Sequence, residues 1–195
     1  MKKLFLLSLA ATMILSLAAC GDSTSSTEAS TAASVAEATA AEATAAGSDV
    51  SLVDISTDFG LTMKLPSDMT LQNVNGNSMY ISSDKSSMVG FTVTDNDGTP
   101  VSEEKEETYL TGLQSKYKDV VMKKFDNTIK IDGKDAFLYE ASFTTPAGSP
   151  IVQTAAAIVD GARVYIITFT CGDNSSSLVQ NIQACIDSIK LTPVQ

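Results

Sequence analysis

The chain has 195 residues, a formal net charge of −10 and no histidine. Without histidine it cannot form Ser-His-Asp or Cys-His nucleophile pairs, nor any metal site that needs an imidazole ligand. The acidic balance argues against a nucleic-acid partner, because neutralising phosphates needs clustered Lys and Arg. These exclusions leave few kinds of enzyme, and we expect a protein that is not an enzyme and uses no cofactor.

The chain start is typical of a secretory signal peptide. Lys2 and Lys3 precede an uncharged, mainly apolar run at 4–19, and a basic start with an apolar middle is the pattern of such peptides. The run is shorter than the roughly 20 residues that a helix needs to cross the hydrocarbon core. We therefore expect residues 1–19 to be a signal peptide and not a permanent membrane span.

The end of this run, Leu17-Ala18-Ala19-Cys20, resembles the lipobox of bacterial lipoproteins. The resemblance implies that the Cys20 thiol carries diacylglycerol, that an acyl chain such as palmitate adds to the anchor, and that Cys20 becomes the mature N-terminus. Two acyl chains suffice for stable membrane anchoring. The expected location is the extracytoplasmic face of the cell membrane. The alternative is ordinary secretion after an A-x-A cleavage, which would leave a free thiol.

The composition changes near residue 50. Residues 21–50 are almost all Ser, Thr, Ala, Glu, Asp and Gly, with nothing larger than Val35 to bury. Such a segment cannot offset the entropy of ordering itself, so we expect a disordered tether over 20–50, starting at the lipidated cysteine, with a reach of roughly 30 Å. The remaining residues, 51–195, have the length of one ordinary domain.

The first half of the domain predicts three strands and a helix. Alternating apolar residues predict strands at about 59–65, 77–82 and 88–94. Ser102, followed by three charged residues, predicts a capped helix over 102–117.

The second half predicts hairpins and a final helix. Asp132-Gly133 and Asp160-Gly161 lie between strand-like runs and indicate two hairpins. The strands at 151–159 and 163–170 are apolar on both faces, so both faces should be covered. After an expected cap at 173–175, a helix carries one apolar stripe, formed by Leu178, Ile182, Cys185 and Ile189. The predicted fold class is α+β, an antiparallel β-sheet flanked by α-helices, that is, an α/β/α sandwich.

Five segments together resemble the PsbP-like family, over about 57–191. They are Phe59–Asp68, the helix expected at 102–117, Ile131–Phe137, Gly161–Phe169 and Ile186–Lys190, with Met69 where the family often has tryptophan. The resemblance implies an antiparallel sheet between helices, and many bacterial members are small lipoproteins of unassigned role. It implies no catalytic residue, because these motifs carry none.

Two sets of residues are candidates for chemistry. Asp95, Asp97 and Glu104 match positions 3, 5 and 12 of a calcium loop, but Val93 occupies position 1 and offers no carboxylate. The alternative, which we favour, is a turn leading into a helix cap. Cys171 and Cys185 lie on apolar stripes, so we expect buried structural thiols, too far apart along the core to form a disulfide.

The sequence therefore predicts a lipid-anchored, non-enzymatic interaction or scaffold module, which binds an unknown envelope protein or ligand. The alternative function is a small-ligand or ion-binding lipoprotein.

Overall fold

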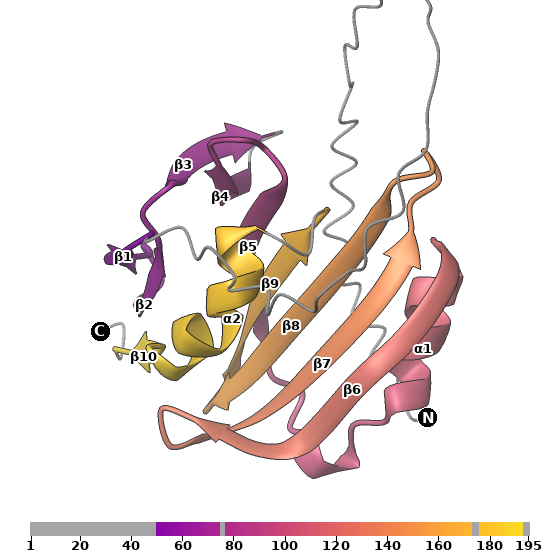
Figure 1. Ribbon diagram of the computed structural model, residues 1–195. Coiled ribbons are helices and arrows are strands. Elements are labelled where there is room, and N and C mark those ends of the chain that lie inside the picture. The colour runs from indigo at the N-terminus through magenta and orange to yellow at the C-terminus, as the bar shows by residue number, and fades with distance from the viewer. Residues whose placement is uncertain (1–49, 75–76, 173–175, 193–195) are drawn as a thin grey trace, which may run out of the picture.

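The computed structural model describes residues 50–74, 77–172 and 176–192, and its described part is mostly antiparallel β-sheet with two α-helices (Figure 1). The signal peptide expected at 1–19, Cys20, most of the tether and the helix cap expected at 173–175 lie outside the described residues. Neither α-helix is long and apolar enough to cross a bilayer; this finding covers the described residues alone.

A seven-stranded antiparallel sheet forms the centre of the fold, in the order β3-β4-β5-β9-β8-β7-β6. Its strands are β3 Met69–Val74, β4 Asn77–Ser82, β5 Ser87–Asp95, β6 Lys118–Ile131, β7 Lys134–Thr144, β8 Pro150–Asp160 and β9 Arg163–Cys171. The two predicted hairpins are confirmed: Gly133 and Gly161 have φ of 74° and 60° between β6 and β7 and between β8 and β9. Glycine adopts this left-handed backbone without steric cost.

A second layer covers one face of this sheet. It consists of α2 (Ser177–Asp187) and a small sheet in the order β1-β2-β10, with β1 Leu52–Ser56, β2 Leu61–Pro66 and β10 Lys190–Leu191. Apolar side chains from both layers form one core, which includes Leu61, Leu65, Ile158, Ile167, Phe169, Leu178, Cys185 and Ile189. Ser176, just after the expected cap, is the N-cap of α2, and its hydroxyl accepts a hydrogen bond from the Val179 amide.

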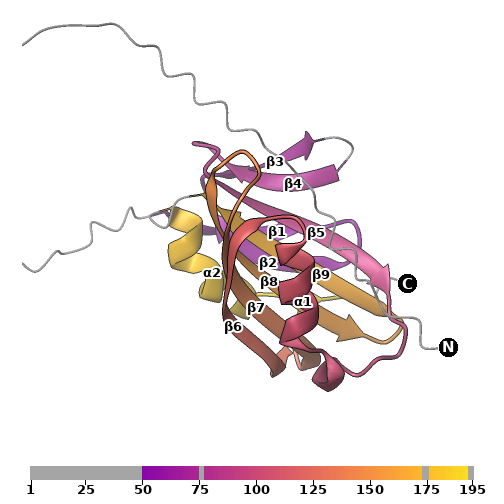
Figure 2. The same ribbon diagram turned by 90° about the vertical axis from the view of Figure 1, so that its right-hand side faces the viewer.

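The opposite face of the sheet is only partly covered. Figure 2 shows α1 (Glu106–Gln114) against β6 and β7, on the side away from α2. The core on this side includes Leu113, Phe137, Tyr139, Phe143, Ala155 and Ile166. The sandwich prediction therefore needs correction, because α2 shares its layer with three strands and α1 covers one part of the other face.

The predicted start of the first helix is wrong. Ser102 lies in a short 3₁₀ turn, Val101–Glu103, and α1 begins only at Glu106. Asn127 of β6 donates hydrogen bonds to the carbonyl oxygens of Ser102 and Glu104, at 3.1 and 3.0 Å. These bonds hold Glu104 in an extended conformation, with φ −63° and ψ 139°. Tertiary contacts thus override the local capping signal.

Candidate binding groove

The two helices leave uncovered surfaces of opposite character. On the α2 side, the outer part of β6 and β7 is polar: Lys123 pairs with Glu140 at 3.5 Å, and Ser142 is half-buried nearby. On the α1 side, the surface over β5, β9 and β8 is mainly apolar and hollowed. A polar face is what water-exposed strands normally carry. The apolar hollow, which we call the groove, is therefore the candidate functional site.

Residue sizes along one row of paired strands create the groove. Across β4, β5, β9, β8 and β7 the directly paired residues are Met79, Gly90, Thr168, Ala155 and Tyr139. Three small residues therefore lie side by side between larger ones. The floor is low at Gly90 and Thr168 because neither has a long side chain.

The walls of the groove are apolar. On one side, the rings of Tyr117 and Phe143 stack with centroids 4.2 Å apart and planes 19° from parallel. On the other side are Met79 and Ile81 of β4, both buried, and Met88 of β5. Aromatic rings and flexible methionines suit apolar ligands of variable shape.

Two hydrogen-bonded turns close one end of the groove. In the β7–β8 loop, the Thr145 hydroxyl oxygen accepts from the Ser149 amide at 3.1 Å. In the β4–β5 turn, one carboxylate oxygen of Asp84 accepts from the Ser82 hydroxyl at 2.6 Å and from the Ser86 amide at 2.9 Å. These bonds hold the pKa of Asp84 below its ordinary value, with the Ser82 hydroxyl the largest cause. Both turns are thus fixed by their own side chains.

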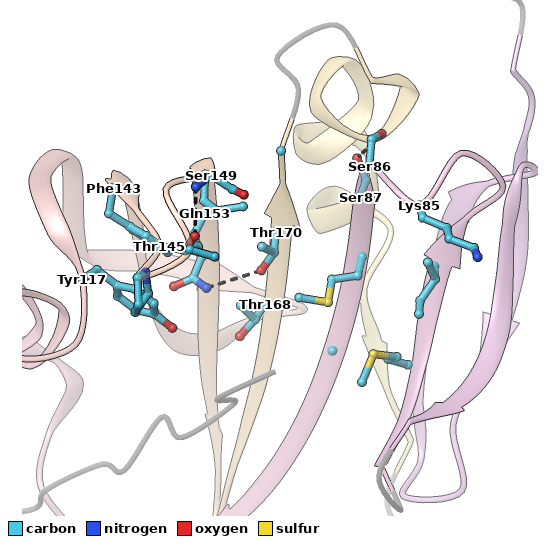
Figure 3. Close-up of a pocket in the computed structure, with 18 residues that line it drawn as sticks. Lys85, Ser86, Ser87, Tyr117, Phe143, Thr145, Ser149, Gln153, Thr168 and Thr170 are labelled. Atoms are coloured by element: carbon cyan, nitrogen blue, oxygen red, sulfur yellow. Dashed lines mark hydrogen bonds between the residues drawn. The ribbon is translucent and has the colours of Figure 1, made fainter. Parts of the chain in front are cut away.

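The polar groups on the floor of the groove come from β8 and β9, and others come from the two turns at its end, as Figure 3 shows. Both polar atoms of Gln153 have a partner: its oxygen accepts from the Tyr139 hydroxyl at 2.8 Å, and its nitrogen donates to the Thr170 hydroxyl at 3.4 Å. Thr168 differs, because it is only 7% exposed and its hydroxyl has no hydrogen-bond partner among the described residues. The Thr168 hydroxyl is not one of the fully enclosed atoms, so it opens toward the groove and remains available to a ligand.

The groove has little charge. Among the described residues, no Asp, Glu or Cys lines it, and Lys85 is its one ionic group. Lys85 is exposed at the rim, opposite Tyr117, and Figure 3 shows its ammonium group extending away from the threonine hydroxyls. Burial raises the pKa values of Tyr117 and Tyr139, so both phenols are neutral at pH 7. These groups suit binding of an uncharged apolar molecule.

The residues of the calcium-loop hypothesis serve other contacts. Asp97 accepts a hydrogen bond from the Thr99 amide at 2.9 Å, and Glu104 accepts one from the Tyr109 hydroxyl at 2.9 Å. Asp95 is the last residue of β5 and lies opposite Arg163 in the register of β5 with β9. Within the described ranges, no three acidic or cysteine side chains are grouped closely enough to hold a metal ion. These contacts match the turn of the alternative that we favoured but not its helix cap, because the N-cap of α1 is Lys105, which makes no side-chain cap hydrogen bond.

Both described cysteines are structural. Cys171 and Cys185 are free thiols buried in the α2-side core, as predicted. Burial is the main cause that raises both pKa values, that of Cys185 to about 12. At neutral pH they are therefore thiols, which are poor nucleophiles.

Sequence reasoning missed the residues that form the groove floor. Gly90 was part of a predicted strand, and Thr168 lay in a strand expected to be covered on both faces. A glycine inside a strand was the one available signal, since it often marks a close approach by a ligand or another backbone.

Comparison with solved structures identifies the fold. The cyanobacterial PsbP protein (CyanoP) of Synechocystis sp. PCC 6803 has a TM-score of 0.55 at 10% sequence identity, covering 78% of this chain and 98% of that one. LpqN of Mycobacterium tuberculosis, described as involved in cell envelope biogenesis, has a TM-score of 0.47 at 11% identity, covering 74% and 92%. No protein-family model and no curated protein matches the sequence. The fold assignment depends on the first likeness, and the chain has a PsbP-like fold.

Proposed function

We propose that this chain is a membrane-anchored extracytoplasmic lipoprotein whose domain binds a small, mainly apolar ligand in the groove. The observation that carries the proposal is the apolar hollow over Gly90 and Thr168, on a face where exposed strands would normally be polar. Small-molecule sites are typically concave and mostly apolar, with a few well-placed polar groups. Of the two functions that the sequence left open, ligand binding has the more specific support.

The groups in the groove favour binding over catalysis. Acid–base catalysis needs a group whose pKa lies near the working pH, within reach of the substrate. The nearest titratable groups are Tyr117 and Tyr139, which burial keeps protonated, and Lys85 at the rim. The chain has no histidine to serve as a base.

Anchoring through Cys20 is the second part of the proposal. Its support is the match of Leu17-Ala18-Ala19-Cys20 to a lipobox and the basic, apolar segment before it. Only about thirty residues separate Cys20 from the first described residue, Val50. A domain attached in this way samples molecules close to the membrane surface.

Titration with a neutral apolar dye tests ligand binding. The chain from residue 20 onward, with Cys20→Ser, needs no detergent, and the chain has no tryptophan to contribute background fluorescence. N-phenyl-1-naphthylamine should bind with saturable fluorescence enhancement, with about one site per chain. Gly90→Val should abolish this binding, because the new methyl groups fill the floor.

The same substitution controls for folding. A Cβ at Gly90 would meet no heavy atom within 4 Å, so the first side-chain atom of Gly90→Val finds open space. Valine is also favoured in strands. The urea midpoint of Gly90→Val should therefore equal or exceed that of the parent chain. Equal dye binding by the two folded proteins would refute the groove as the site.

A protein scaffold is the second candidate function. Leu71 on the edge strand β3 and Val121 on the edge strand β6 are 61% and 56% exposed. Open strand edges can pair with an extended segment of a partner. If this edge pairing is the function, Leu71→Lys should prevent in-cell cross-linking to a specific envelope protein, whereas Gly90→Val should not.

A further inference from the structure

We infer that the ligand of the groove is an uncharged molecule with an apolar body and a carbonyl oxygen that accepts a hydrogen bond from the Thr168 hydroxyl. The inference depends on the proposed function and narrows it to a chemical class. Uncharged acyl esters, amides and ketones have this composition. Two neighbouring residues of the floor, Gly90 and Thr168, carry the argument.

Gly90 leaves open space at the floor of the groove. Strand-interior glycines usually mark a bulge, a tight bend, or a place where a ligand or another backbone comes close. The pairing of β5 with β9 runs without a register shift from Ser87 to Asp95, and the pairing with β4 ends at Gly90, so no bulge lies at this position. No protein atom lies within 4 Å of the position that its Cβ would occupy, so no other backbone comes close. The space above Gly90 therefore has room for a ligand against the backbone.

Thr168 supplies the matching polar group. It is paired directly with Gly90, so its side chain stands beside the space above the glycine. Its hydroxyl oxygen has no hydrogen-bond partner among the described residues and is not one of the fully enclosed atoms, so it opens toward the groove. Thr170, two residues further along β9 on the same face, differs because its hydroxyl already accepts a hydrogen bond from the Gln153 side-chain nitrogen at 3.4 Å. The Thr168 hydroxyl is thus placed to donate to a ligand seated over Gly90.

The charges select an uncharged ligand. A buried anion needs a cation close by, and the one cation at the groove, Lys85, points away from Thr168 (Figure 3). A buried cation would need a carboxylate, and the described lining has none. The chain as a whole is also strongly acidic, at −10, which repels anions. A carbonyl compound without formal charge satisfies Thr168 and needs neither counter-ion.

Two naphthalene dyes separate the hydrogen bond from apolar burial. Prodan is uncharged and carries a ketone oxygen, whereas N-phenyl-1-naphthylamine is uncharged and has no carbonyl. Thr168→Val keeps the side-chain shape and removes the donor. It should weaken Prodan binding about fivefold, the effect of one net hydrogen bond, and leave binding of the second dye unchanged. Thr168→Ser should restore Prodan binding.

Thr92→Val is the matched control. Thr92 lies on β5, two residues from Gly90 on the same face, and is exposed outside the groove. Its substitution should change the binding of neither dye. The anionic dye 8-anilino-1-naphthalenesulfonate is N-phenyl-1-naphthylamine with an added sulfonate. It should bind at least tenfold more weakly than N-phenyl-1-naphthylamine, because the described floor of the groove offers its charge no cation; tenfold corresponds to about 1.4 kcal/mol.

The outcomes distinguish this inference from the proposed function. If Thr168→Val weakens both uncharged dyes equally, or neither, the hydrogen bond to a carbonyl is refuted, although the groove still binds apolar molecules. If the anionic dye binds as tightly as its uncharged counterpart, the uncharged class is refuted. If neither uncharged dye binds the parent chain, the proposed function itself fails. Selective loss of Prodan in Thr168→Val, with rescue by Thr168→Ser, supports the inference.

Discussion

Aspartate substitutions on β9 measure where each face of the sheet is covered. Ile166 and Ile167 are adjacent, and their side chains point to opposite faces. Ile166 is 4% exposed in the α1-side core, and Ile167 is 0% exposed in the α2-side core. Thr92, the cross-strand neighbour of Ile166, is exposed on the same face. Three single substitutions to Asp therefore compare two covered sites with one open site.

The expected effects differ by several kcal/mol. Truncating a buried isoleucine costs about 2–5 kcal/mol, and a buried carboxyl without a partner adds several more. A domain is typically stable by about 5–15 kcal/mol. Ile166→Asp and Ile167→Asp should each remove most or all of this stability. Thr92→Asp should cost about 1 kcal/mol or less, because it buries no charge.

Urea titration followed by circular dichroism gives the three midpoints. A buried Asp has a pKa above its unfolded-state value of about 3.9. Between these two pKa values the unfolded state binds fewer protons than the folded state, so stability falls as pH rises. The penalty for Ile167→Asp should therefore be larger at pH 7 than at pH 4. An unchanged midpoint for Ile166→Asp, with loss of folding only in Ile167→Asp, would show that Ile166 is not buried and would refute our account of the α1-side core.

Three further outcomes are expected. Cys20→Ala should move the protein from the membrane fraction to the medium or leave an unprocessed precursor; a processed variant that still partitions into detergent and incorporates labelled fatty acid would contradict anchoring at Cys20. In the native Cys20→Ser chain, Cys171 and Cys185 should not react with a thiol reagent at pH 8. Both should react once the protein is denatured without reductant. Rapid reaction of the native protein would contradict their burial. The Asp132 carboxylate accepts hydrogen bonds from the Leu191 amide and the Lys190 ammonium, which hold its pKa below 3.8. This stabilisation is present above pH 3.8 and is lost as pH falls through the folded-state pKa. Asp132→Asn should therefore lower the free energy of unfolding by about 1 kcal/mol at pH 7, and the difference between the two proteins should shrink as pH falls below 3.8. A difference that does not depend on pH would contradict the charge effect.

Local patterns predicted the elements whose signals are short-range. The alternation at 77–82 and 88–94 gave β4 and most of β5, and the two Asp-Gly pairs gave both hairpins. Continuous apolar runs at 151–159 and 163–170 predicted burial on both faces, and the centres of β8 and β9 are buried on both. In each case the deciding signal lies within one strand or one turn.

The elements that were missed depend on partners far away in sequence. β1 has mixed composition and exists because it pairs with β2, and the two residues of β10 extend that sheet from the other end of the chain. β3 carries the exposed Leu71 and is fixed by pairing with β4. Such strands have weak patterns of their own, because intrinsic β-propensity depends strongly on context.

The groove could not be predicted from the sequence, because it arises from the pairing register of the strands. Gly90, Ala155 and Thr168 are unremarkable small residues, and 78 positions of sequence separate the first from the last. Antiparallel pairing of β5 with β9 and of β9 with β8 places them in one row across three adjacent strands. A shift of one residue in either pairing would turn one of them to the α2-side core and close the hollow. The open space above Gly90 and the neighbouring Thr168 hydroxyl therefore become a candidate site only in the assembled sheet.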